Sequence, residues 1–208
     1  MGRSATSVLA YITWHRPRAD VDTAVYEDAL ERFHRSLARV PPSGFDGSSA
    51  FCIGELPWQA EPTPDEPAAY EDWYLVESWS ALGVLEEAAV ARGHVSRHDA
   101  VASLAAKTVG GVYRLSEGHA RPERARVGVW VAPAFGRAAP TAADLLGDGM
   151  DRDCAALWRR CLGLGPAPEY CLLAPEIPAG VAPARLPAGW TVRSAELRTV
   201  WRSPARSG

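Results

Sequence analysis

Four segments in the first 115 residues carry aromatic and β-branched residues with a period of two, which is typical of strands. They are Ser7–His15, Phe45–Leu56, Tyr70–Trp79 and Thr108–Leu115. After the first strand, an apolar stripe at helical spacing predicts a helix that begins at Asp20 or Asp22 and ends near Arg39. A second helical stretch lies before the last strand, where Gly93 interrupts it and Ser96 restarts it with a capping-box pattern. This β-α-β-β-α-β order predicts a four-stranded antiparallel sheet with two helices on one face.

The same order begins again after a polar linker. Strands are predicted at Arg126–Ala132, Glu169–Ala174 and Trp190–Arg202. Between the first two of these, an amphipathic stripe predicts a helix, and its members are Met150, Cys154, Leu157, Trp158, Cys161 and Leu162. After the strand at Glu169–Ala174 the chain is rich in Pro and Ala, at the place where a second helix would complete the repeat. We therefore expect a tandem repeat of two ferredoxin-like halves, residues 1–117 and 124–208, of which the second is reduced.

The fold class that follows is α+β, with the two open sheets covering each other. This arrangement resembles the dimeric α/β-barrel superfamily, here as an intramolecular pseudo-dimer. Two short motifs add a resemblance over about the first 115 residues: Glu77-Ser78-Trp79 at the end of a strand, and Ser96-Arg97-His98 in the following helix. They resemble the antibiotic-biosynthesis monooxygenase domains of the dimeric α/β-barrel superfamily. That resemblance implies a cofactor-independent oxygenase, or a heme-binding protein with His98 as the iron ligand. Both kinds of relative use an Asn on the sheet, and this chain contains no asparagine.

Composition narrows the function classes. The net charge is -3, Lys107 is the single lysine, and the arginines are scattered, so we expect no nucleic-acid partner. No apolar run is long enough to span a membrane, and the N-terminus lacks the apolar core of a signal peptide, so we expect a cytoplasmic protein. The four cysteines form no C-x-x-C pair, which favours small buried thiols over a metal site or a disulfide. P-loop, dinucleotide-binding and nucleophile-elbow motifs are absent.

The residues that carry candidate chemistry lie on the first and third strands and on the second helix. We predict His15 or His98 as a general base, with Trp79 beside it. The predicted ligand-binding residues are Tyr11, Thr13, Trp73 and Tyr74. Three strand carboxylates, Glu55, Glu71 and Glu77, are further candidates for a raised pKa, although outward-facing charges are more common on strands.

Each of these residues also has a structural interpretation. The histidines can be exposed or cap residues, the tryptophans can be core, and the polar strand can simply line a barrel. The preferred function is a monooxygenase-like enzyme that acts without a cofactor on a flat aromatic or polyketide-like molecule. The alternatives are a non-catalytic ligand-binding or structural barrel and a heme-binding protein. We expect a monomeric pseudo-dimer or a homodimer.

Overall fold

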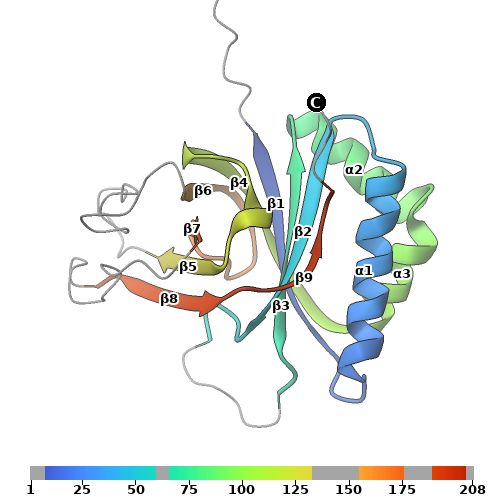
Figure 1. Cartoon of the computed structure of the whole chain (residues 1–208), viewed down its shortest axis with the longest axis horizontal. Coiled ribbons are helices and arrows are strands. Elements are labelled where there is room, and N and C mark those ends of the chain that lie inside the picture. The colour runs from blue at the N-terminus through green and yellow to red at the C-terminus, as the bar shows by residue number, and fades with distance from the viewer. Residues whose placement is uncertain (1–7, 60–65, 133–154, 176–188, 205–208) are drawn as a thin grey trace, which may run out of the picture.

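The computed structural model describes residues 8–59, 66–132, 155–175 and 189–204 (Figure 1). The first half contains β1 (Leu9–Pro17), α1 (Thr23–Arg39), β2 (Phe45–Gly54), β3 (Ala69–Val76), α2 (Trp79–Ala91), α3 (Val95–Leu104) and β4 (Ala105–Gly118). A short turn, η1 (Pro122–Arg124), leads to β5 (Val127–Ala132), β6 (Ala156–Leu164), β7 (Tyr170–Ala174), β8 (Thr191–Glu196) and β9 (Arg198–Arg202). The predicted order of the first half is confirmed, and its second helix is divided into α2 and α3 around Gly93.

The described strands form one antiparallel sheet in the order β8-β5-β7-β6-β4-β1-β3-β2-β9. The two edge strands follow each other in the chain with only Leu197 between them, so one bent segment joins both edges and the sheet curls into a barrel (Figure 1). The first half contributes β4-β1-β3-β2, and the second half repeats this order as β8-β5-β7-β6. The last strand of each half also pairs with the other half, β4 with β6 and β9 with β2. The expected α+β fold, two ferredoxin-like units packed as an intramolecular dimeric α/β barrel, is therefore confirmed.

All three helices of the described chain cover the sheet of the first half, on the outside of the barrel (Figure 1). The N-terminus of α1 is fixed by Asp22, whose Oδ1 accepts hydrogen bonds from the backbone N–H groups of Ala24 and Val25 at 2.8 and 3.3 Å. Ser78 caps α2 in the same way, through the N–H of Ala81. By contrast the N-cap residue of α3 is His94, whose side chain makes no capping hydrogen bond, so the predicted cap at Ser96 is wrong. No helix of the described segments is long and apolar enough to cross a membrane.

One predicted element is wrong. The stripe around Leu157 and Trp158 belongs to strand β6, which pairs with β4 and β7, and not to a helix. Ala156 and Trp158 pack inside the barrel, while Leu157 packs on the opposite face of the sheet with Val129 and Leu172. Because both faces are buried here, neighbouring apolar residues mimic the three- and four-residue spacing of a helix. In the strand Cys161 is exposed instead of buried. Leu162, further along the same strand, is also exposed, and the last two members of the stripe, Met150 and Cys154, lie outside the described residues.

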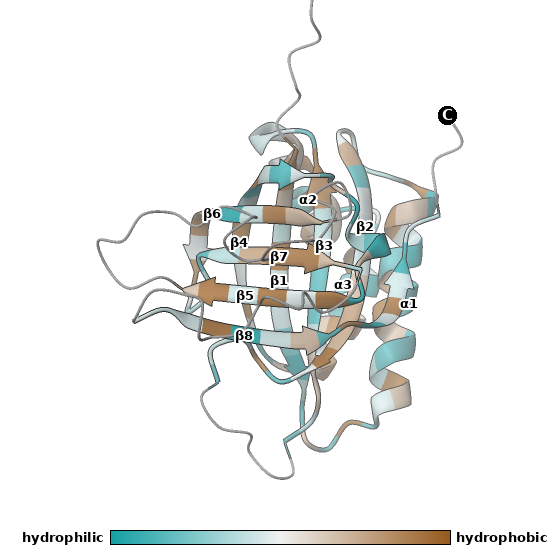
Figure 2. Ribbon diagram, turned by 60° about the vertical axis from the view of Figure 1, so that its left-hand side comes forward, coloured by the Kyte–Doolittle hydropathy of each residue, from teal (hydrophilic) through white to brown (hydrophobic). Residues whose placement is uncertain are grey.

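The second half carries an apolar face of its own. Figure 2 shows that β5 and β7 are strongly hydrophobic along most of their length. Alternate residues of these strands belong to different clusters, because Trp130 and Cys171 pack inside the barrel and Val129 and Leu172 pack on its outer face. A strand that is buried on both faces needs apolar residues at successive positions. For this reason the strands of the second half show little alternation of apolar and polar residues, and the order of the elements is the clearer sign of the repeat.

The interior of the barrel holds one buried carboxyl group. Glu71 on β3 accepts hydrogen bonds from three indole N–H groups: Trp14 at 2.5 Å, Trp73 at 2.5 Å and Trp130 at 2.7 Å. Trp130 comes from the second half, so this contact ties the two halves together. Burial nevertheless raises the pKa of Glu71 to about 7, the indole donors offsetting only part of the desolvation. Of the three candidate strand carboxylates, Glu71 therefore has a raised pKa, but it lies in the core.

The raised pKa of Glu71 predicts a loss of stability with rising pH. The unfolded chain ionises this group near 4.5, whereas the folded chain keeps the proton up to about pH 7. Between these pH values ionisation favours the unfolded state, and across the whole range the free energy of unfolding falls by on the order of 3 kcal/mol. We expect Glu71→Gln to remove this pH-dependent part, as measured by urea unfolding of the variant and the parent protein from pH 4 to 8.

The amide of Glu71→Gln turns an N–H toward an indole N–H, so the variant should be less stable at low pH and should approach the parent as pH rises. The matched control is Glu55→Gln, which alters an exposed carboxylate just beyond β2. Stability curves of Glu71→Gln and the parent that run parallel over the whole range would contradict the assignment.

Candidate active site

A cavity of about 160 Å³ lies between the helices and the outer face of the first-half sheet. Its floor comes from β1 and β3, and its walls come from α1, α2 and α3. The exposed residues Glu86 and Ala102 stand at its mouth. Most of the wall is apolar, formed by Leu30, Phe33, Leu85, Ala89 and Val101. An engineered cavity of about 150 Å³ holds one benzene molecule, so this cavity encloses about one aromatic ring and a larger ligand extends through the mouth.

The floor of the cavity is polar because of the pleat of two strands. On β1, residues 11, 13 and 15 face the helices, while residues 10, 12 and 14 belong to the barrel core. On β3, Asp72 and Tyr74 face the helices, while Glu71 and Trp73 face the barrel. Antiparallel pairing places Thr13 directly opposite Asp72 and Tyr11 opposite Tyr74. The polar side chains of the two strands thus form one continuous patch on the cavity floor.

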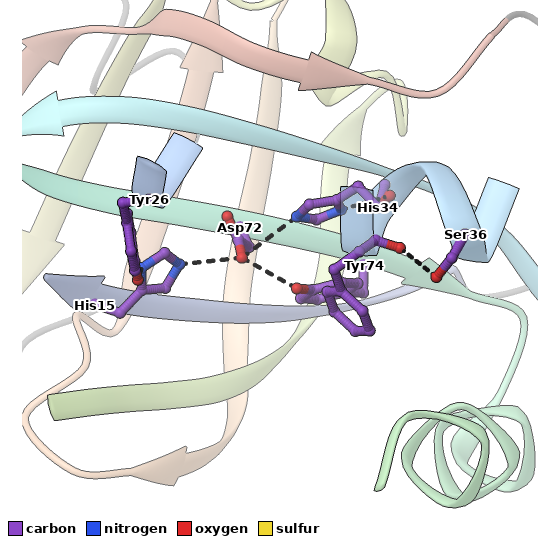
Figure 3. A network of polar contacts seen from close by, with 8 residues as sticks. His15, Tyr26, His34, Ser36, Asp72 and Tyr74 are labelled. Carbon is purple, nitrogen blue, oxygen red and sulfur yellow. Dashed lines mark hydrogen bonds and ion pairs between the residues drawn. The ribbon is translucent and has the colours of Figure 1, made fainter. Parts of the chain in front are cut away.

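Asp72 is the centre of this patch, and its residue is only 2% exposed. Its Oδ2 lies 3.0 Å from His15 Nε2, 3.4 Å from His34 Nε2 and 3.0 Å from the Tyr74 hydroxyl, which donates a hydrogen bond to it (Figure 3). His15 comes from β1 and His34 from α1, so the carboxylate joins the sheet to the helix above it. A buried carboxylate is stable only when charge partners or hydrogen bonds replace its lost water.

The contacts extend outward from both histidines as a chain. His15 Nδ1 lies 2.7 Å from the Tyr26 hydroxyl, and His34 Nδ1 lies 2.8 Å from the Ser48 hydroxyl. If each imidazole turns an Nε2–H toward Asp72, both Nδ1 atoms are free to accept hydrogen bonds from these hydroxyl groups. The order is then Tyr26, His15, Asp72, His34 and Ser48. Such a chain can accept a proton at one end and redistribute the charge over its length.

The electrostatics of the chain keep Asp72 ionised. Burial alone would raise the pKa of this carboxyl, but the charges and contacts of His15 and His34 hold its pKa well below the usual range. The phenols behave in the opposite way. Burial, and next the charge of Asp72, raise the pKa values of Tyr26 and Tyr74 well above the ordinary value, so both remain hydrogen-bond donors. Near the mouth, burial and then Glu86 raise the pKa of Tyr11 to about 12.

Two features leave this network open to a ligand. Within the described chain, Asp72 Oδ1 is buried and makes no hydrogen bond. The Nε2 atoms of His15 and His34 are within ion-pair distance of Oδ2, but their N–H directions miss the geometry of a hydrogen bond. Buried polar atoms are rarely left unpaired in proteins. A hydroxyl or acidic C–H group of a bound molecule would pair with Asp72 or His15 once the side chains that cover these atoms move aside.

The structure brings together five of the residues predicted from sequence. Tyr11, Thr13, His15, Tyr74 and His98 all line the cavity. His98 stands on α3 with its ring edge against Phe33 and its Nδ1 3.2 Å from Asp99.

Two predicted residues lie elsewhere. Trp73 is fully buried inside the barrel, on the opposite face of β3. Trp79 is 46% exposed at the first position of α2 and does not line the cavity. The predicted third strand ends three residues too late, and this error placed Trp79 on the sheet; the strand ends at Val76.

Four residues of the network were not among the sequence candidates: Tyr26, His34, Ser48 and Asp72. Asp72 shares the face of Tyr74 by simple alternation, so its place on the floor could have been inferred. His34 and Tyr26 are separated by eight positions on α1, and both are buried. A histidine inside an apolar helical stripe is a signal for a buried partner, but the sequence does not identify that partner.

The described residues contain no group of His, Cys, Asp and Glu side chains that would hold a metal ion. Heme was a candidate through His98, which does line the cavity. However, a cavity that encloses about one ring does not fit a porphyrin unless α2 and α3 move away from the sheet. The cavity as it stands therefore does not fit heme.

Comparisons with known proteins support the fold. No protein-family model and no curated protein matches the chain. Among solved structures, a putative monooxygenase from Fusobacterium nucleatum subsp. nucleatum is 10% identical, with a TM-score of 0.58, covering 97% of this chain and 96% of that one. An anthrone oxidase-like protein is also 10% identical, with a TM-score of 0.53, covering 98% of this chain and 97% of that one. At this identity the likeness shows the fold, and this chain has the dimeric α/β-barrel architecture of those proteins over nearly its whole length.

Proposed function

We propose that this protein is a cofactor-independent, monooxygenase-like enzyme that removes a proton from a small flat aromatic substrate. The observation that carries the proposal is the ionised Asp72 between His15 and His34 on the floor of a largely apolar cavity. A carboxylate behind an imidazole orients it and stabilises the positive charge that it acquires as a general base. The whole-chain likeness to a putative monooxygenase and an anthrone oxidase-like protein is consistent with this chemistry.

The proposed proton path begins at the substrate and ends on His15. In the structure Nδ1 of His15 contacts the Tyr26 hydroxyl, which also lines the cavity. A substrate proton can pass to the Tyr26 oxygen while the Tyr26 proton moves to Nδ1, so that the phenol stays neutral. The imidazolium then faces Asp72 at 3.0 Å. Tyr74 donates to the same carboxylate oxygen and fixes its position, which makes it a positioning residue.

The substrate that suits this arrangement has an acidic CH₂ group in a ring flanked by aromatic rings, as in an anthrone. Its conjugate carbanion can react with O₂ directly, because the delocalised anion supplies the electrons. One O₂ is consumed, the CH₂ becomes C=O and the second oxygen leaves as water, which balances the reaction. The protein needs only to remove the proton, orient the ring and exclude water, and its apolar walls suit the last two tasks.

The proposed reaction predicts turnover of an anthrone. We expect the protein to consume one O₂ per molecule of an anthrone, as measured with an oxygen electrode and by absorbance of the quinone product. Asp72→Asn and His15→Gln should each lower kcat/KM by about 10²- to 10⁴-fold, the range associated with loss of general-base catalysis. His119→Gln is the matched control, because His119 is an exposed histidine beyond β4. Absence of O₂ uptake, or equal rates in the parent protein and both variants, would contradict the proposal.

A second prediction separates proton removal from the reaction with oxygen. Under strictly anaerobic conditions the parent protein should shift the absorbance of bound anthrone to that of its anion, and Asp72→Asn should bind the ligand without this shift. Admission of O₂ should then convert the anion to the quinone. Stoichiometric binding with neither an anaerobic shift nor O₂ uptake would instead identify a non-catalytic ligand-binding barrel.

A further inference from the structure

A cluster of arginines occupies the far side of α1 from the active-site cavity. Arg32, Arg35 and Arg39 follow one another at intervals of three and four residues, which places them on one face of α1. Arg97, in the first turn of α3, completes the cluster, and the four side chains with Ser36 line a cavity of about 280 Å³. Every charged side chain that lines this cavity is positive. We call this set, Arg32, Arg35, Ser36, Arg39 and Arg97, the arginine pocket.

The charges of the pocket are only partly neutralised. Arg32 pairs with Asp28 at 2.8 Å, and Arg35 pairs with Glu31 one turn away on the same helix. Within the described chain, Arg39 and Arg97 make no ion pair or hydrogen bond through their side chains. These two residues leave about two uncompensated positive charges in one concave site. Like charges held together in this way repel one another, so an anion that bridges them is favoured.

Of the two helices that carry the pocket, α3 adds to its preference for an anion, whereas Arg39 lies in the last turn of α1, whose dipole offsets part of its charge. Arg97 lies in the first turn of α3, where the backbone N–H groups and the helix dipole favour negative charge. That turn contains no acidic residue, and its cap position, His94, leaves the helix N–H groups without a side-chain acceptor. Guanidinium groups present paired N–H donors in a planar fork, which matches the oxygens of a phosphate.

The pocket also includes a residue of α3, the helix that buries the fewest side chains. Within the described structure α3 has no buried residue, whereas α1 buries five, including Tyr26, Phe33 and His34. One face of α3 carries Arg97 in the pocket, and another carries His98, Val101 and Ala102 in the wall of the active-site cavity. A ligand that connects Arg97 to the arginines of α1 would therefore hold this wall in place.

We propose that the arginine pocket is a binding site for a phosphate dianion, either free or as a phosphomonoester group, and that its occupancy fixes α3 over the active-site cavity. The charge of the ligand matches the two uncompensated arginines. Binding of the phosphate depends only on the residues of the arginine pocket and is independent of the proposed reaction.

The test is calorimetric titration of the full chain at pH 7.5 with inorganic phosphate and, separately, with phenyl phosphate, at constant ionic strength set with sodium chloride. Both should bind at a single site in the parent protein. Because a hydrogen bond to a charged group is worth a tenfold factor or more in affinity, Arg39→Gln and Arg97→Gln should each weaken binding by at least about tenfold. Arg126→Gln removes an exposed arginine just before β5 and should leave the affinity unchanged.

The two ligands distinguish the source of the anion. Equal affinities would indicate a free phosphate site, and much tighter binding of phenyl phosphate would indicate a phosphate carried by a larger molecule. Amide hydrogen exchange supplies the second readout: phosphate should slow exchange in Val95–Leu104 of the parent protein and not of Arg97→Gln. Binding no stronger than that of chloride, or equal in all three variants, would overturn the site. Binding without slower exchange in α3 would overturn its coupling to the cavity.

Discussion

Burial of the Asp72 carboxylate is the constraint on which the first half of this molecule depends. A carboxylate removed from water is costly unless opposite charge and hydrogen bonds replace the solvent. Here the compensation comes from two elements, since His15 and Tyr74 are on the sheet and His34 is on α1. The helix is therefore attached to the sheet by a specific polar contact as well as by apolar packing. The same contact places an ionised group and two imidazoles at the floor of the cavity between them.

Two neighbouring residues of β3 show how the sheet separates two environments. Glu71 points into the barrel, where burial raises its pKa, and Asp72 points toward the helices, where two histidines lower its pKa. The two pKa shifts change the stability of the fold in opposite directions with pH. Ionised Asp72 stabilises the fold above the pKa that this group has in the unfolded chain, and this contribution is lost as pH falls. Ionisation of Glu71 destabilises the fold as pH rises toward 7. One strand thus carries two acids whose surroundings move their pKa values in opposite directions, one in the core and one at the cavity.

Much of the fold could be predicted because its signals are local. The strand alternation, the Asp22 cap and the break at Gly93 each depend on a few neighbouring residues, and the structure confirms them. The helix predicted around Trp158 failed because burial on both faces of β6 is a property of the assembled barrel. For the same reason, alternation placed Tyr11, Thr13 and His15 together but could not show that His34 meets Asp72. That contact joins residues 38 positions apart, from α1 and β3, and only the packing of the helix on the sheet determines it.

We expect a flat aromatic molecule to bind over Asp72 in the cavity between the helices and the sheet. The direct test is a crystal structure of the protein with an anthrone bound under anaerobic conditions. One ring should lie between Phe33, Leu85 and Tyr74, with the acidic carbon next to the Tyr26 hydroxyl or Asp72 Oδ1. An anthrone found elsewhere on the molecule, while the cavity is closed by its own side chains, would contradict this expectation.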